Sequence, residues 1–405
     1  MGPEQDRTEL EPEPEAPTVP LAVIAREWGR IGVTGFGGPP AHIALLRKLC
    51  VTERGWIPAN EFEDAIAACN LLPGPASTQL AIWCGHRLRA RIGAVVAGVC
   101  FIGPGLVMIL ALSALFLAAH PPTWVLGAAA GAGAAVPAVA LHAAWGLAPA
   151  SWKRIQDPEQ PGPHTPRAAR VRWVAYALIG GAAAATIGPY LVLVLIACGL
   201  IEIGVRIRRD GPAVRGVLPL ALPATAATGG LAALAWTAFK VGALSYGGGF
   251  VIIPLMQHDA VSTYHWMTGS QFLDAVALGQ VTPGPVVLTT GVVGYAAAGI
   301  GGALLAVAVA FSPSFAFVLL GARHFDRLRH NRPVQAFLTG AGPSVIGAIA
   351  GSAIPLALAL SHGWQYILLG AAALWLFLAR RGVVSTLLLA AACGLISALA
   401  GAAVS

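Results

Sequence analysis

The chain has 405 residues, of which 57% are hydrophobic and only 11% are charged, and its mean hydropathy is +0.72. Soluble globular proteins contain roughly 45–50% apolar and about 25% charged residues, so this composition excludes an ordinary soluble domain and indicates a protein of the lipid bilayer. The net charge of +7 comes from basic residues in short stretches between apolar runs. Such stretches are typical topology signals of membrane proteins, and they do not indicate a partner nucleic acid.

The first twenty residues are acidic and rich in proline, and they lack the basic start and the cleavage site of a signal peptide. A stretch of this composition cannot bury enough apolar surface to fold. Residues 1–20 are therefore expected to form a disordered tail that stays in the cytoplasm.

The next two apolar segments are interrupted. Residues 21–50 are broken by Gly35-Phe36-Gly37-Gly38-Pro39-Pro40, and residues 65–84 by Pro73-Gly74-Pro75. Glycine and proline at these places remove helical hydrogen bonds, so each segment is expected to contain two half-helices. Re-entrant hairpins and pairs of complete spans satisfy the flanking charges equally well.

Five apolar runs reach or exceed the roughly 20 residues needed to span hydrocarbon. They are residues 92–119, 124–150, 301–321, 334–360 and 383–403. A sixth stretch, residues 217–237, is the natural connecting span between two halves of the chain. The predicted fold is an all-α polytopic membrane protein.

The two halves repeat each other. Residues 31–75 align without a gap with residues 241–285 at a constant offset of 210 residues, so both glycine-rich and Pro-Gly-Pro breaks recur in the second half. The basic loop 87–91 corresponds to an uncharged stretch, while the uncharged turn 120–122 corresponds to a basic loop at 323–332. Because basic loops stay in the cytoplasm, inside and outside are exchanged, which predicts two inverted-topology repeats. The expected domains are residues 21–205, a basic loop and connecting span at 206–237, and residues 238–405.

The breaks are the expected binding site. A half-helix that begins inside the membrane presents free N–H groups and the positive end of its dipole, and both favour an anion. The candidate substrate-binding residues are the glycines and the hydroxyl or amide donors near the breaks: Gly35, Gly37, Gly38, Ser77, Thr78, Gln79, Ser245, Gly247, Gly248, Thr282 and Thr289. The residues that make the second break of each half are Pro73, Gly74, Pro75, Pro283, Gly284 and Pro285.

Two charged pairs also occupy equivalent positions in the repeat. Arg30 and Lys240 are predicted to neutralise a bound dianion. Placing a cation in the bilayer costs about 2.5–3.5 kcal/mol, so a cation in both halves indicates a function. The alternative is that both are snorkelling side chains at helix ends. Asp64 and Asp274 are candidates for proton coupling. The alternative is that they are acids at helix N-termini, where the helix dipole favours a negative charge. The repeat partner of His42 is an isoleucine, so the repeat does not support a special role for this histidine.

The chain contains no Walker loop, no Gly-x-Ser-x-Gly and no metal-ligand spacing. We therefore expect neither an enzyme nor a cofactor or metal site. The motifs Gly35 to His42, Asn70 to Gln79, Lys240 to Gly249 and Gln280 to Pro285 resemble the chromate ion transporter family in its long, two-domain form.

The resemblance covers the chain from about Leu21 to its C-terminus, and it implies export of chromate across a bacterial cytoplasmic membrane, with sulfate as a structural mimic. A homodimer is a possible assembly. One departure is visible after the motifs, because Phe311-Ser312-Pro313 stands where the first half has Phe101-Ile102-Gly103-Pro104-Gly105.

The predicted mechanism is alternating access around the meeting point of the four half-helix ends. Export of a dianion from a cell that is negative inside is favourable by about 4.6 kcal/mol per 100 mV. A transporter of sulfate or another oxyanion, an anion channel, and a structural subunit of a larger membrane complex are the alternatives.

Overall fold

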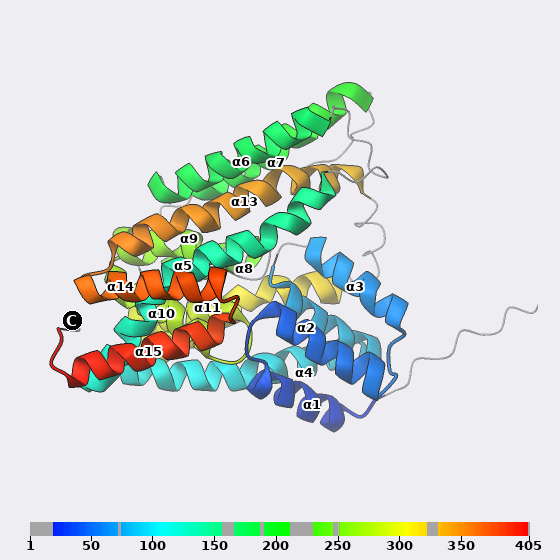
Figure 1. Ribbon diagram of the computed structural model, residues 1–405. Helices are drawn as coiled ribbons and strands as arrows, with labels where there is room; N and C mark the ends of the chain where they lie inside the picture. The colour runs from blue at the N-terminus through cyan, green and yellow to red at the C-terminus, as the bar shows by residue number, and fades with distance from the viewer. Residues whose placement is uncertain are drawn as a thin grey trace, which may run out of the picture.

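The computed structural model describes residues 19–71, 74–155, 166–186, 190–210, 230–245, 250, 252–321 and 331–403, and every regular element in these ranges is helical (Figure 1). The predicted all-α fold is confirmed. Residues 1–18 of the predicted tail and residues 211–229 of the predicted connecting segment lie outside the described part.

The first half is built from helices of very different lengths. Its elements are α1 (Leu21–Thr34), α2 (Pro39–Arg47), the π-helical η1 (Lys48–Glu53), α3 (Ala59–Leu71), α4 (Ala76–Phe116), α5 (Thr123–Arg154), α6 (Pro166–Thr186) and α7 (Leu191–Asp210). Helices end on both sides of each predicted break, because glycine and proline interrupt the backbone hydrogen bonds there.

The second half follows the same order. Its elements are α8 (Gly230–Leu244), α9 (Ile252–Gln257), the π-helical η3 (His258–Thr263), α10 (Gly269–Val281), the 3-10 turn η4 (Val286–Leu288), α11 (Thr289–Gly321), α13 (Arg332–Leu358), α14 (Gly363–Ala373), the π-helical η6 (Leu374–Leu378) and α15 (Val383–Leu399). The two π-helical turns η1 and η3 occupy equivalent places, so the repeat is structural as well as sequential. α8 runs continuously across position 237, where the sequence placed a domain boundary.

α4 and α11 each fold back on themselves. Their backbones leave the helical region at Arg89 and Ala90 and at Ala298 and Gly299, with nearly identical dihedral angles in the two places. A side chain on Gly85 would collide with Gly93 and Ala97 beyond the bend, which is possible only if the two arms of α4 pack side by side. Each element is thus a short arm that begins at a Pro-Gly-Pro break, followed by a long antiparallel arm.

The bends also explain the departure in the later part of the repeat. Ala90 and Gly299 are 209 positions apart, whereas the earlier motifs of the two halves are 210 positions apart. The offset of 209 also matches Pro104 in α4 with Pro313 in α11. The pseudo-symmetry therefore continues through the long arms with a one-residue shift.

The late helices of each half pack on the other half. α5 lies against α15 and α14, while α13 lies against α6 and α7 (Figure 1). Glycines allow these approaches: a side chain at Gly131 of α5 would meet the backbone of α15 at Ala390 and Gly394, and one at Gly347 of α13 would meet the backbone of α6. Each half is completed by the other.

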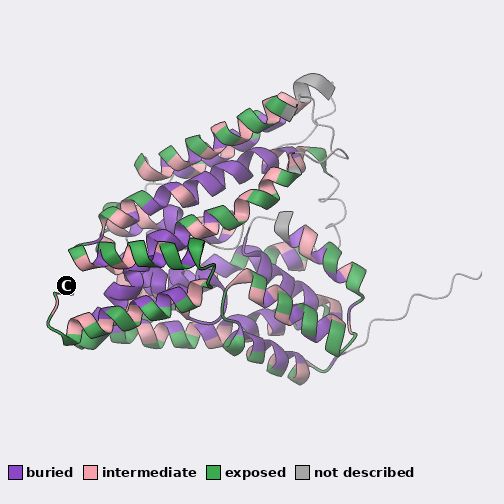
Figure 2. Cartoon of the chain, viewed as in Figure 1, coloured by how far each residue is buried: buried purple, intermediate pink, exposed green. Residues whose placement is uncertain are grey.

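The described helices include four that are long and apolar enough to cross a membrane: Ala76–Phe116, Thr123–Lys153, Val286–Gly321 and Arg332–Leu358. Exposed residues lie on the outer faces of the helices, and buried residues lie toward the centre (Figure 2). Many of the exposed ones are large and apolar, such as Val107, Leu178 and Leu358. Apolar surface of this extent indicates contact with lipid.

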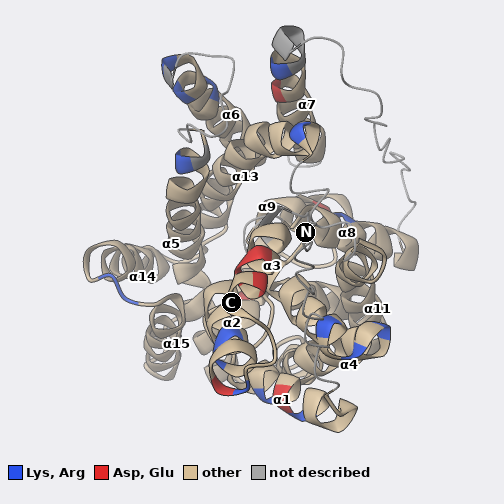
Figure 3. Ribbon diagram, turned by 90° about the vertical axis from the view of Figure 1, so that its right-hand side faces the viewer, with Lys and Arg blue, Asp and Glu red and all other residues tan. Residues whose placement is uncertain are grey.

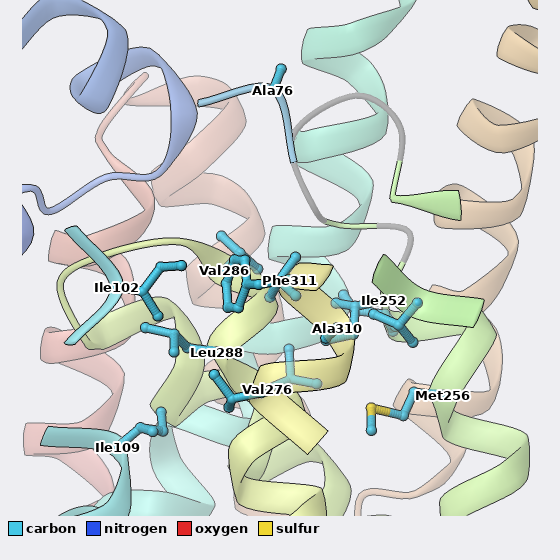
Figure 4. Packing of buried hydrophobic residues seen from close by; sticks show 14 of the residues in the cluster. Ala76, Ile102, Ile109, Ile252, Met256, Val276, Val286, Leu288, Ala310 and Phe311 are labelled. Atoms are coloured by element: carbon cyan, nitrogen blue, oxygen red, sulfur yellow. The ribbon is translucent and has the colours of Figure 1, made fainter. Parts of the chain in front are cut away.

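The core that holds the breaks in place is formed by both halves. Buried side chains of α4, α9, α10, η4 and α11 belong to one hydrophobic cluster, including Ile102, Ile252, Val276 and Phe311 (Figure 4). Lys and Arg residues gather at helix ends on the face that Figure 3 shows, among them the ends of α5, α6 and α7.

Candidate functional site

The breaks of the two halves are joined by reciprocal backbone hydrogen bonds. The Gly74 N–H donates to the Ser245 carbonyl at 3.0 Å, and the Gly284 N–H donates to the Gly35 carbonyl at 3.1 Å. Gly74 and Gly284 are repeat partners, and so are Gly35 and Ser245. All four predicted breaks therefore meet in one place, and each half supplies one partner to each bond.

The Pro-Gly-Pro turns need glycine at their centres. Gly74 and Gly284 have φ values of 121° and 105°, a region that residues with a Cβ rarely adopt. A Cβ on Gly74 would lie 2.5 Å from Gln79 Nε2 and 3.3 Å from Ser314 Oγ. The turn at Gly74 is thus closed by its neighbours as well as by its φ, whereas at Gly284 the φ is the main obstacle to a side chain.

The long arms of α4 and α11 cover the opposite breaks. Ser314 of α11 lies against Gly74, and Gly105 of α4 lies so close to Pro283 that a Cβ there would collide with the Pro283 carbonyl. Gly105 and Ser314 are repeat partners at the offset of 209 residues found above. Each Pro-Gly-Pro turn is therefore in contact with the long arm of the other half.

The first helix of each half lies directly on the long arm of its own half. A Cβ on Gly32 would be 2.6 Å from the Phe101 carbonyl of α4, and a Cβ on Gly242 would collide with the Ala310 carbonyl of α11. In addition, the buried Trp28 Nε1 donates to the Ala81 carbonyl of the short arm at 2.9 Å. These contacts hold the C-terminal ends of α1 and α8 at the centre.

His42 lies in this centre, although the repeat comparison gave it no role. Its Nε2 is 2.9 Å from the Gly35 carbonyl and its Nδ1 is 3.3 Å from Ser77 Oγ. A carbonyl only accepts, so Nε2 carries the proton and Nδ1 accepts from the Ser77 hydroxyl. The sequence signal for this histidine was its position in the first glycine-rich motif. The comparison of the repeats missed it, because only the first half has the histidine.

The predicted hydroxyl and amide donors lie in the buried interior. Those whose side chains are buried are Ser77, Thr78, Gln79, Ser245, Thr282 and Thr289. Thr282 and Thr289 donate to helix carbonyls at Leu278 and Val286, at 2.7 and 2.9 Å. The hydroxyls of Thr78, Ser245 and Ser314 are buried without a hydrogen-bond partner among the described residues.

Buried hydroxyls without partners are uncommon in proteins, because each loses hydration and gains nothing. Thr78 and Ser245 belong to the predicted site, while Ser314 was not predicted. The Gln280 amide nitrogen, three residues before the second Pro-Gly-Pro turn, also has no hydrogen-bond partner in the part of the chain that the structure describes. An arrangement of this kind has free donors for a polar ligand.

Helix N-termini add further donors. α4 and η4 begin at Ala76 and Val286, directly after the Pro-Gly-Pro breaks, and within the described residues neither has a side chain that caps its first turn. α2 adds no such donor, because its first two residues are prolines and its next two N–H groups donate to the Gly38 carbonyl. The first N–H groups of a helix lack internal partners and carry the positive end of the dipole. These termini, together with the free hydroxyls, are suited to an anion.

The two predicted cations are placed differently from the hydroxyls. The Arg30 side chain is 69% exposed and lies 3.7 Å from the Glu27 carboxylate. Lys240 is only 13% exposed, and its Nζ lies 2.5 Å from Asp259 Oδ2, which also accepts from Thr237. Each cation therefore has a carboxylate partner, and direct contact with a substrate stays a prediction.

These ion pairs have related positions in the two halves. Glu27 of α1 also pairs with Arg54 at the end of η1, and Lys240 of α8 pairs with Asp259 of η3. In both halves an ion pair thus connects the first helix to the π-helical turn, with the signs of the charges exchanged.

The two predicted acids differ in burial. Asp64 on α3 is exposed, whereas Asp274 on α10 is buried. Of the remaining predicted residues, Gly37 and Gly38 have positive φ values of 101° and 73° in the first break. Pro73, Gly247 and Gly248 lie outside the described residues.

Comparison with known proteins adds the family. A family model described as Chromate transporter matches residues 22–203 and 232–398. The chain is 31% identical over 353 residues to a protein of Cupriavidus metallidurans named chromate transport protein, covering 84% of each chain. A protein of Pseudomonas aeruginosa with the same name is 32% identical over 344 residues, which cover 81% of this chain and 79% of that one.

One shorter relative is also informative. The uncharacterized transporter YwrB of Bacillus subtilis is 37% identical over 112 residues, which are 28% of this chain and 55% of that transporter. That relative is therefore about half as long as this chain. No solved structure matches.

Proposed function

The chain belongs to the chromate transporter family, and from this premise we propose that it exports chromate across the cytoplasmic membrane by alternating access. The relatives named as chromate transport proteins cover most of the chain, which supports chromate as the substrate. These relatives are named as transporters, and this supports a function in transport without an enzymatic reaction.

The observation that carries the proposed site is the reciprocal pairing of the breaks, Gly74 with Ser245 and Gly284 with Gly35. Around these bonds lie uncapped helix N-termini and unpartnered hydroxyls. Chromate is a tetrahedral dianion that accepts hydrogen bonds on every oxygen, so several convergent donors without their own acceptors suit it. We place the substrate there.

The pseudo-symmetry supports the transport mechanism. Related halves whose broken helices meet at the centre are typical of transporters that expose one central site alternately to each side. In the proposed topology the two repeats are inverted, the breaks form re-entrant hairpins, and the N-terminus is cytoplasmic. The face on which Lys and Arg gather is then the cytoplasmic one (Figure 3).

The membrane potential supports the direction of transport. Moving a charge across the membrane changes its free energy by about 2.3 kcal/mol per 100 mV. A dianion inside a cell that is negative inside is therefore expelled without a further energy source. Sulfate has the same shape and charge, so it is expected to compete.

The test is radiolabelled chromate flux in proteoliposomes of the purified protein, with an imposed potential and with or without excess sulfate. The matched variants are Gly74→Ala and Gly103→Ala, because a Cβ at Gly74 meets Gln79 at 2.5 Å while one at Gly103 meets nothing within 4 Å. Because the φ of Gly74 is unfavourable for alanine, we expect Gly74→Ala to destabilise the turn by about 1–3 kcal/mol. The chromate flux of this variant should fall about tenfold or more.

Gly103→Ala should leave flux within about twofold of the unsubstituted protein, since a helical alanine in open space costs nothing. Both variants are checked for a monodisperse size-exclusion profile first. Full flux with Gly74→Ala would remove the break from the site. No flux of the unsubstituted protein under any gradient would reject the function, and currents beyond carrier turnover without counterflow would show a channel.

A further inference from the structure

The start of α10 lies at a cavity that the proposed substrate site does not use. Its volume is about 390 Å³, and it is lined by the turn between α4 and α5, by α5 and α10, and by the start of α14. Ala118, Ala119, Thr268 and Ser361 of the lining are exposed, so the cavity reaches the surface. The start of α14 lies at the left of Figure 1, opposite the face on which Lys and Arg gather (Figures 1 and 3).

Asp274 lines this cavity and is only 9% exposed. It makes no ion pair and no hydrogen bond with another described residue. It packs closely against α5, where a Cβ on Gly133 would collide with its Oδ1 atom. An ionised carboxylate in such surroundings loses hydration without gaining a cation, and binding a proton removes this penalty.

The cavity also contains an unpartnered histidine nitrogen. His362 Nε2 is buried and has no hydrogen-bond partner among the described residues, while the backbone N–H of His362 donates to the Gln365 side chain at 3.0 Å. Within the described lining, His362 and Asp274 are the titratable side chains. The cavity is thus lined by a histidine with an unpartnered ring nitrogen and by a buried carboxylate without a cation among the described residues.

No other described charge compensates Asp274. Titratable or charged groups on the elements that pack against α10 are His142 and Lys153 on α5, Tyr295 on α11, Cys393 on α15, His258 and Asp259 on η3, and Cys84, His86, Arg87, Arg89, Arg91 and Cys100 on α4. None of them lines the cavity. Asp259 is already paired with Lys240, and His142 contacts Phe377 edge-on.

We propose that Asp274 is a proton-binding site that water reaches through this cavity from the face opposite the basic one, and that a proton bound there moves inward as the anion moves outward. The first part stands on the geometry of the cavity. The coupling to an anion rests on the proposed function. Uptake of a proton from outside would add the proton gradient to the membrane potential as a driving force.

The proton site is tested without transport by labelling with dicyclohexylcarbodiimide, an apolar reagent that reacts with protonated carboxyl groups. Mass spectrometry of the full-length protein in detergent should find the label on Asp274 about tenfold more than on the exposed Asp64 at neutral pH, because burial favours the protonated form. Labelling should decrease as the pH is raised. Equal labelling of the two acids, or none at Asp274 at any pH, would overturn the proposal.

The coupling is tested in proteoliposomes that contain a pH-sensitive dye, with the variants Asp274→Asn and Glu63→Gln. Glu63 is a half-exposed carboxylate of α3 paired with Arg47, so Glu63→Gln removes one negative charge away from the cavity. Asp274→Asn should abolish chromate-dependent proton movement while chromate counterflow stays within about threefold of the unsubstituted protein. Glu63→Gln should keep both.

Proton movement that persists in Asp274→Asn would overturn the proposal, and so would the loss of counterflow together with proton movement in a correctly folded variant. Failure of the proposed function looks different, because then the unsubstituted protein shows no chromate counterflow while Asp274 is still labelled.

Discussion

At the scale of single residues, Lys240 shows how a repeat position acquires a different partner in each half. Its counterpart Arg30 is largely exposed, whereas Lys240 is mostly buried at 2.5 Å from Asp259. A lysine that already has a close carboxylate is electrically neutral as a pair, so its attraction for a dianion is weakened. The ion pair gives Lys240 a structural role that does not require the substrate.

The first prediction separates these roles with a double-mutant cycle. Lys240→Met leaves the Asp259 carboxylate buried without its cation, so we expect a loss of stability of about 3 kcal/mol and reduced flux. The double variant with Lys240→Met and Asp259→Asn should regain the thermal stability of the unsubstituted protein, because no charge is left unpaired. Its chromate flux should be within about threefold of that of the unsubstituted protein. Thermal unfolding in detergent and proteoliposome flux are the measurements.

If the double variant is stable but transports nothing, Lys240 acts on the substrate itself, as the sequence suggested. Asp259→Asn alone is the matched control, since it leaves the lysine without a carboxylate.

At the scale of elements, the bends within α4 and α11 decide how the breaks are enclosed. Both bends use a residue with positive φ, Ala90 at 49° and Gly299 at 62°. The ψ values of −146° and −152° place both in a region that is essentially reserved for glycine. Only the second half has glycine there, so the first half holds a strained alanine.

The second prediction follows from this strain. Ala90→Gly should stabilise the protein by about 1 kcal/mol, since the relief of about 1–3 kcal/mol of strain exceeds the added freedom of the unfolded chain. Gly299→Ala should destabilise it by a similar amount. Ala94→Gly, at a buried helical position on the long arm of α4, is the control and should be destabilising by about 1 kcal/mol.

Thermal unfolding of the purified variants is the measurement for this set. A lower melting temperature for Ala90→Gly than for the unsubstituted protein would show that the bend is not strained.

At the scale of the whole molecule, the halves depend on each other. The late helices are exchanged, with α5 on α14 and α15 of the second half and α13 on α6 and α7 of the first. The hydrogen bonds between Gly74 and Ser245 and between Gly284 and Gly35 also cross between the halves.

The third prediction is that the chain tolerates a cut within residues 211–229, between α7 and α8. When the two fragments are expressed together, they should copurify and keep flux within about tenfold, because the contacts between the halves remain available. Each fragment alone should aggregate or be degraded, since α5 then lacks α14 and α15, and α13 lacks α6 and α7. Copurification by a tag on one fragment tests this directly, and separate stable fragments would contradict it.

The halves are not identical in arrangement, and this affects their acids. α10 packs along α5, and Asp274 is enclosed there. The equivalent α3 has no packing interface with α13 in the described part of the chain beyond marginal contact, and Asp64 is exposed. A symmetric sequence therefore yields one buried and one exposed carboxylate.

The sequence by itself determined the membrane class, the long apolar helices, the helix ends at the glycine and proline motifs, and the equivalence of the two halves. These features are local, because composition, hydropathy and backbone chemistry act over a few residues. Only the tertiary structure decided which segments meet: the cross-half bonds of Gly74 and Gly284, the pairing of Lys240 with Asp259, the place of His42, and the different fates of Asp64 and Asp274. Such partners depend on how helices far apart in the chain pack, and equal residues in a repeat can receive unequal neighbours once the packing is asymmetric.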